Sequence, residues 1–210
     1  MSYLKSYDFS LLTEKVIFTD NTQNEKIILN GENNLFKNNN QLLEIEIGSG
    51  NGHLLNRLAF QNRIINYIGI EKREKRIIRC REKQIKNNTE NLIWICGEAF
   101  ASMEKFINDE IVDRMMMTFP DPWPKNRHAK NRLFKSKFVE LFYSKLKKGG
   151  EFIFVTDDQP YFNEASSIAK EHSGFRYDES LFDDVLTESL FGDRWKKDNR
   201  TIFQFRLYKK

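Results

Sequence analysis

The chain has 210 residues, with 34 lysines and arginines against 30 aspartates and glutamates, and a formal net charge of +4. This length is enough for one α/β domain with a complete core and short for two. No apolar run approaches the roughly 20 residues that cross a bilayer, and the first residues lack the apolar core of a signal peptide. These features exclude a membrane-spanning protein and predict a cytoplasmic one.

The two cysteines, Cys80 and Cys96, have neither the spacing of a metal site nor that of a disulfide framework. Cys80 falls in a charged helical stretch and Cys96 in an apolar strand. We therefore expect two structural thiols in a reducing cytosol, and no metal.

Residues 1–40 are polar and irregular, with weak strand-like pieces at 15–18 and 26–29. Such a segment cannot bury a core of its own. We expect an N-terminal arm, packed or partly flexible, ahead of a single domain at 41–210.

An apolar strand at 42–47 runs into a glycine loop at 48–52, and a helical stretch begins at His53. This arrangement lets the backbone approach a ligand closely at a helix N-terminus. The next strand ends on Glu71, 19 residues after Gly52, where an acid typically accepts hydrogen bonds from a ribose diol. The pattern predicts a cofactor that contains adenosine.

The spacing of the glycine loop distinguishes between two such cofactors. Dinucleotide enzymes use G-x-G-x-x-G, whereas here the glycines are Gly48, Gly50 and Gly52, and His53 takes the place of the last dinucleotide glycine. Glu46 adds a negative charge that would repel a pyrophosphate and attract a cation. S-adenosylmethionine carries an ammonium and a sulfonium and no phosphate, so the electrostatics favour it. A nucleotide-dependent oxidoreductase is the rival interpretation.

Further acids follow the next two predicted strands. Glu98 comes after the apolar strand at 92–96, and Asp121 comes after the strand at 112–119. The ligand crevice of an open parallel sheet lies at the carboxyl ends of its strands, so these acids should converge with Glu46 and Glu71. Glu98 has an equal alternative role, as an acid at the N-terminus of the following helix.

The segment 119–128 has three prolines in five residues, which force the chain to turn out of the sheet. The turn presents Asp121 and Trp123, the latter either near the ligand or simply buried in the core. Basic residues follow without any acid, and a polyanion such as RNA would bind them. A solvated helix face is the alternative for this run, which comprises Lys125, Arg127, Lys130, Arg132, Lys135 and Lys137.

The remaining pattern completes an α/β fold. Helices at 134–146 and 161–172 flank a strand at 151–155, and the alternating segment 201–207 predicts a final antiparallel edge strand. The fold class is therefore α/β, a Rossmann-like, mostly parallel sheet with helices on both faces and an antiparallel C-terminal edge strand.

The residues between about 42 and 176 resemble the tRNA (guanine-N7-)-methyltransferase family in order and spacing. The proline–tryptophan motif is the most specific part, because the glycine loop alone indicates only a methyltransferase. The motifs are Glu46-Ile47-Gly48-x-Gly50-x-Gly52, Gly69-Ile70-Glu71, Phe119-Pro120-Asp121-Pro122-Trp123-x-Lys125-x-Arg127-His128-x-Lys130-x-Arg132 and Thr156-Asp157.

The resemblance implies a class I methyltransferase fold and transfer of a methyl group from S-adenosylmethionine to N7 of a guanine in the variable loop of tRNA. It gives Asp121 a catalytic or substrate-binding role. It implies cofactor binding by Glu46, Gly48, Gly50, Gly52, Glu71, Glu98 and Asp121, and substrate binding by Lys125, Asp157 and Thr187. The family's C-terminal Thr-x-x-Glu motif keeps Thr187, but Leu190 stands where the glutamate is expected, and Glu188 is the candidate substitute.

Guanine N7 has a lone pair and no hydrogen, so its methylation needs alignment and electrostatic preorganisation without a base. We expect Asp121 to hold the guanine, and Arg127, Lys130 and Arg132 to contact the RNA backbone. Two further alternatives are a non-catalytic RNA-binding subunit and methylation of another RNA position. The protein is expected to be a monomer or homodimer.

Overall fold

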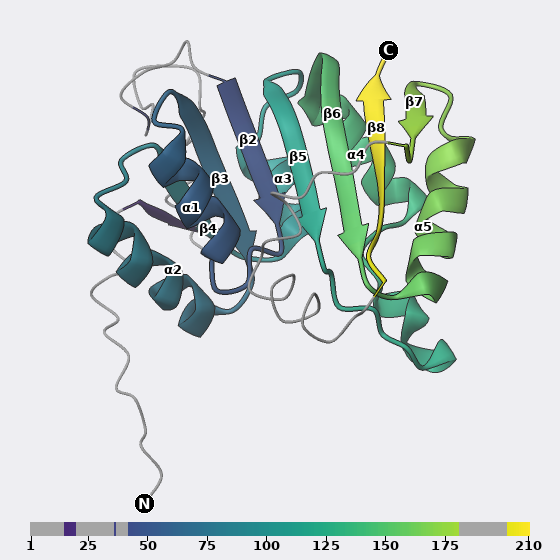
Figure 1. Ribbon diagram of the computed structural model, residues 1–210, viewed down its shortest axis with the longest axis horizontal. Coiled ribbons are helices and arrows are strands. Elements are labelled where there is room, and N and C mark those ends of the chain that lie inside the picture. Colours follow the sequence, from purple (N-terminus) through teal and green to yellow (C-terminus); the bar gives the residue numbers. More distant parts are fainter. Residues whose placement is uncertain (1–14, 20–35, 37–41, 181–200) are drawn as a thin grey trace, which may run out of the picture.

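The computed structural model describes residues 15–19, 36, 42–180 and 201–210, which form an eight-stranded mixed sheet with helices on both faces (Figure 1). The strand order is β1-β4-β3-β2-β5-β6-β8-β7. The strands are β1 Val16–Phe18, β2 Leu42–Ile47, β3 Ile65–Glu71, β4 Leu92–Cys96, β5 Val112–Thr118, β6 Leu146–Thr156, β7 Phe175–Asp178 and β8 Phe203–Lys209. The helices are α1 His53–Gln61, α2 Glu74–Asn87, α3 Ala99–Phe106, the short 3-10 helix η3 Asn126–Asn131, α4 Ser136–Lys145 and α5 Gln159–Glu171.

Strands β1 to β6 pair in parallel and β8 runs antiparallel to both of its neighbours. Strand β4 is buried along its whole length, which is why it reads as an uninterrupted apolar run. Helices α1 and α2 cover one face of the sheet, and α3, α4 and α5 cover the other. The predicted fold class is confirmed.

The last strand is antiparallel, as predicted, but it does not lie at the edge. β8 lies between β6 and the short β7, and β7 forms the edge instead. Phe205 and Leu207, which share one face of β8, are fully buried. The alternation at 201–207 does not distinguish an inner strand from an edge strand.

The predicted N-terminal arm contributes one strand to this sheet. β1 pairs with β4, in a register that places Ile17 opposite Ile95. The strand-like piece predicted at 26–29 lies outside the described residues. No helix in the described part of the chain is long and apolar enough to span a membrane.

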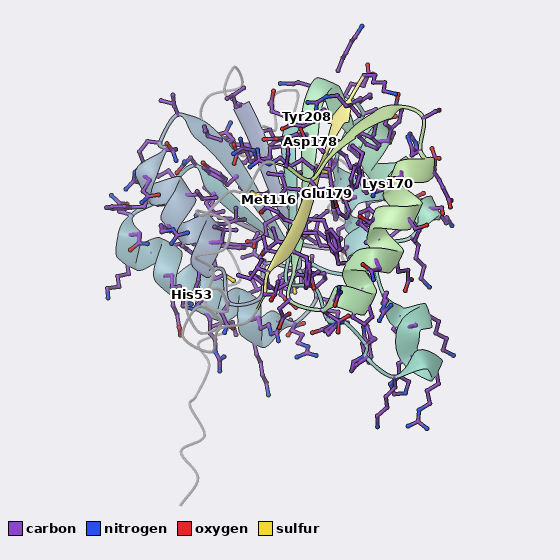
Figure 2. All side chains as sticks on the ribbon, turned by 45° about the vertical axis from the view of Figure 1, so that its right-hand side comes forward. His53, Met116, Lys170, Asp178, Glu179 and Tyr208 are labelled. Carbon is purple, nitrogen blue, oxygen red and sulfur yellow. The ribbon has the colours of Figure 1, made fainter. Side chains whose placement is uncertain are left out.

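The sheet separates two apolar clusters. The one beneath α1 and α2 contains Trp94 and Met116, and Figure 2 shows Met116 inside the domain. The larger cluster, beneath α3, α4 and α5, is dominated by aromatic rings. At its centre, Phe134 contacts the rings of Phe142, Phe152, Phe154 and Phe205, with ring centroids 5.4–5.9 Å apart.

Phe134 is fully buried although it lies within the basic run, between Arg132 and Lys135. Substituting it with alanine leaves a cavity among four rings, so Phe134→Ala should lower the free energy of unfolding by about 3–5 kcal/mol. The control Phe60→Ala removes a ring that is 54% exposed on α1 and should lower it by less than about 1 kcal/mol. Urea unfolding of the three proteins measures both values, and equal losses would contradict the packing described here.

Candidate active site

A cleft of about 260 Å³ opens at the carboxyl ends of the central parallel strands, along the lower edge of the sheet in Figure 1. The structure brings all four predicted acids to this cleft: Glu46 from β2, Glu71 from β3, Glu98 after β4 and Asp121 after β5. The predicted convergence at one edge is therefore observed.

The glycine loop forms one wall of the cleft. Gly48, Gly50 and Gly52 have φ values of 77°, 56° and 69°, a region that side chains other than glycine rarely adopt. A Cβ atom at Gly52 would lie 2.7 Å from both Cys80 Sγ and Trp94 Cη2, so this position has no room for one. At Gly48 a Cβ atom would meet no protein atom within 4 Å, so this side of the loop leaves space for a ligand.

Helix α2 braces the same loop from behind. Lys83 Nζ donates a hydrogen bond to the carbonyl oxygen of Asn51 over 2.8 Å. Within α1, the side-chain amide of Asn56 also donates to the carbonyl oxygen of Gly52 over 2.8 Å. Burial and the nearby Lys83 charge lower the pKa of His53, which begins α1, lines the cleft and lies near the lower edge of the sheet in Figure 2.

Glu71 is only 5% exposed and is fixed by three donors. The backbone amides of Gly50 and Arg73 donate to its two oxygens over 3.1 and 3.0 Å. Arg76 adds an ion pair at 3.3 Å. The carboxylate is therefore held in one orientation at the cleft, where ligand hydroxyls can donate to it.

Glu46 is only 3% exposed and has fewer partners than Glu71. The hydroxyl of Thr118 donates to its Oε1 over 2.9 Å, while Oε2 is buried without a hydrogen-bond partner among the described residues. Burial, together with the smaller effect of the Glu71 charge, raises the pKa of Glu46 to about 7, although the hydrogen bond from Thr118 lowers it. A buried acceptor without a partner is costly, so a ligand with cationic N–H donors would fit this position well.

Glu98 performs the capping role that we considered for it. It is the N-cap of α3, and its carboxylate accepts a hydrogen bond from the amide of Ala101 over 3.0 Å. The residue is exposed and also lines the cleft. The two predicted roles are thus compatible in space.

The proline loop forms the opposite wall. Phe119 and Trp123 adopt φ values of 50° and 46°, which are uncommon for residues other than glycine and often accompany functional sites. Asp121 lies between them, exposed at the cleft. Trp123 is half-buried, lines the cleft and meets the His128 ring edge-on with centroids 5.9 Å apart. Simple burial of Trp123 in the core is thereby excluded.

The prediction that Arg132 contacts the RNA backbone is wrong, because this side chain is only 8% exposed. Its Nε donates to the carbonyl oxygen of Pro122 over 2.8 Å, and its guanidinium forms ion pairs with Glu164 and Asp158. It also lies over the ring of Tyr161, 4.9 Å from the centroid. Arg132 therefore ties the proline loop to α5 and is not available to a phosphate.

The other predicted substrate residues lie outside the cleft lining. Lys125, Arg127 and Lys130 are exposed on and beside η3, and Asp157 is half-buried just after β6. The C-terminal substrate positions Thr187, Glu188 and Leu190 fall outside the described residues.

Sequence reasoning missed several residues that shape the cleft. Thr118, the hydrogen-bond partner of Glu46, carries a signal: it is the polar residue that ends an otherwise apolar strand core. Arg76 carries no such signal, because only the fold brings α2 to the glycine loop, and His53 was considered only as the residue in the place of a dinucleotide glycine. Within the described residues no group of three or more histidines, cysteines or carboxylates could hold a metal ion.

The comparisons with known proteins agree with this geometry. The family model described as "Putative methyltransferase" matches residues 40–205. The tRNA (guanine-N(7)-)-methyltransferase of Chlamydia abortus is 33% identical, with the match covering 83% of this chain and 80% of that protein. The enzyme of the same name from Ureaplasma urealyticum is 37% identical, over 77% of this chain and 67% of that protein.

Solved structures show the fold. The 30S ribosomal A1408 methyltransferase from an uncultured bacterium has a TM-score of 0.57 at 22% identity, over 84% of this chain and 90% of that one. A SAM-dependent methyltransferase from Aquifex aeolicus has a TM-score of 0.53 at 15% identity, over 80% and 81%. The fold is that of class I methyltransferases, and the chain belongs to the tRNA (guanine-N7)-methyltransferase family.

Proposed function

We propose that this protein transfers the methyl group of S-adenosylmethionine to N7 of a guanine in tRNA. The observation that carries the proposal is the convergence of Glu46, Glu71 and Asp121 on one cleft beside an exposed basic segment. The test is incubation with labelled S-adenosylmethionine and unmodified tRNA, followed by mapping of the modified nucleotide. N7-methylguanosine at one position supports the proposal, whereas label on another atom or position means that a different RNA site is methylated.

The cleft residues fit the cofactor. When bound, S-adenosylmethionine supplies an electrophilic methyl group on a positively charged sulfur. Glu46 would accept hydrogen bonds from the cofactor's ammonium through its unpartnered oxygen, and Glu71 would accept them from the ribose hydroxyls. Glu98 stands where it can accept from an adenine amino group while it caps α3. The open space above Gly48 lets the cofactor lie against the loop.

The chain's remaining work is alignment and electrostatic stabilisation. Guanine N7 would form the new N–C bond with its own lone pair while the bond between the methyl carbon and sulfur breaks and leaves a neutral thioether, so no residue must remove a proton. Asp121 accepts hydrogen bonds from the guanine N1–H and amino group, and its charge stabilises the positive charge that develops on the base. The proline loop, held by Arg132 through the Pro122 carbonyl, keeps that carboxylate in place. Accurate placement of this kind accounts for large rate factors.

We propose that Lys125, Arg127 and Lys130 contact the RNA backbone, and that Asp157 and Thr187 bind the substrate. The three basic residues are exposed, so they can neutralise phosphates without losing an internal partner. Such contacts position the RNA and do not read its sequence. Recognition of the tRNA shape and of an unstacked base would determine which nucleotide is methylated.

Substituting Asp121 with asparagine should abolish most methyl transfer while leaving cofactor binding close to normal. The amide cannot accept from both guanine donors with a full negative charge, so we expect kcat to fall by about 100-fold or more. Single-turnover methylation and calorimetric binding of S-adenosylmethionine measure the two properties separately. Glu104→Gln, an exposed substitution on α3, is the control. Wild-type turnover by Asp121→Asn would remove the proposed role.

Cofactor affinity should fall as the pH decreases below 7. The pKa of Glu46 is about 7 in the protein alone, and a bound cation favours the ionised form, so binding releases a proton. Between about pH 7.5 and 5.5 we expect the Kd of S-adenosylmethionine to rise roughly tenfold or more.

Glu46→Gln is the control for this titration. This variant should bind S-adenosylmethionine weakly, with an affinity nearly independent of pH around 7. The remaining pH dependence would come from His53, whose pKa is lowered by burial and by the nearby Lys83 charge. Isothermal calorimetry across this range measures the effect. An equally steep profile in Glu46→Gln would show that another group is responsible.

A further inference from the structure

We propose that the outer face of α2 is a second phosphate-binding surface for tRNA, across the cleft from Lys125, Arg127 and Lys130. This inference rests on the proposed function and names a part of the protein that the family motifs do not include. We call it the α2 surface and define it by Lys72, Arg73, Lys75, Arg76 and Arg79.

These five basic residues line one shallow groove, and Glu74 is the only acid among the described residues that line it. Lys75 and Arg76 lie four and three residues before Arg79, which is the spacing of one helix face, and Lys72 and Arg73 directly precede the helix. The opposite face of α2 is buried through Ile77, Ile78 and Cys80. The basic residues are thus presented together at the surface by a helix that the core holds in place.

The groove is continuous with the cofactor cleft, because Lys72, Arg73 and Arg76 line both. Lys72, Arg73 and Lys75 are exposed, whereas Arg76 pairs with Glu71 at 3.3 Å and Arg79 contacts the Asn51 side chain at 3.5 Å. An RNA strand in the groove would therefore lie directly beside the bound cofactor. Exposed lysines and arginines at such a place attract phosphates with little sequence choice.

Helix stability does not explain this charge pattern. The N-terminal end of a helix favours acidic residues and disfavours basic ones. Yet the start of α2 has Lys72, Arg73, Lys75 and Arg76 around a single acid, Glu74. Departures from local rules of this kind are expected where a residue serves function. A bound phosphate would be favoured both by these cations and by the helix dipole.

The two basic surfaces lie on opposite sides of the cleft. α2 packs with α1 at one end of the lower sheet edge in Figure 1. The chain after β5 runs from this edge towards α5, where Arg132 forms an ion pair with Glu164. RNA held on one side only could pivot about that contact. Phosphate contacts on both sides would fix its orientation, so that one guanine faces the methyl donor.

The test compares two double variants that lose the same charge. Lys72→Gln/Lys75→Gln changes the α2 surface, and Lys86→Gln/Lys148→Gln changes two exposed lysines at the opposite, amino end of the sheet. The salt dependence of tRNA binding is measured for both, with cofactor binding as a check because Lys72 lines the cleft. We expect the first variant to bind about tenfold more weakly at low salt, with a log–log salt slope shallower by about 2.

The second variant should keep the wild-type slope within about 0.5. The single variant Lys75→Gln changes a residue outside the cofactor cleft and should reduce the salt slope of tRNA binding by about 1. A reduced slope in this variant could not be caused by weaker cofactor binding. Wild-type affinity and slope in the α2 variants, or equal losses in the control, would overturn the inference while N7 methylation by the wild type still stood. A wild type that binds tRNA through α2 but forms no N7-methylguanosine would retain the α2 surface and refute the proposed function.

Discussion

The cleft depends on holding two carboxylates almost out of water at the ends of neighbouring strands. Glu71 is compensated by two backbone amides and Arg76, whereas Glu46 receives one hydroxyl and leaves an oxygen without a partner among the described residues. Ionising Glu46 therefore destabilises the unliganded fold as the pH rises from about 4.5 through 7. A cationic ligand removes that penalty, because opposite charges interact strongly where water is excluded. The fold thus keeps one site that only a positively charged ligand completes.

Close packing behind the glycine loop keeps this arrangement rigid. A Cβ atom at Gly69 would lie 2.2 Å from the Trp94 ring, and one at Gly52 would lie 2.7 Å from the same ring. The indole is fully buried and donates a hydrogen bond to Gln84 of α2 over 2.9 Å. The glycines therefore serve two purposes, since they permit the positive φ values of the loop and let β3 and α1 approach Trp94.

The sequence predicts those features of the site that depend on a short segment of the chain, and not those that depend on contacts between distant segments. The acids Glu46, Glu71 and Asp121 could be located because each follows an apolar run, and parallel strands bring their carboxyl ends together. Arg132 could not be assigned, because its burial depends on Tyr161 and Glu164, about 30 residues further along the chain. The inner position of β8 likewise depends on β7, whose four residues give a weak pattern.

Burial also separates the two kinds of charge that the reaction needs. Glu46 and Glu71, which would hold the cofactor, are buried in the cleft, where salt screens them little, whereas Lys72, Lys75, Lys125 and Lys130 are exposed and strongly screened. Raising the salt concentration should therefore release the RNA long before the cofactor. Because the cationic cofactor and the anionic RNA meet charges of opposite sign at different depths, one small surface can bind both without either competing for the other's contacts.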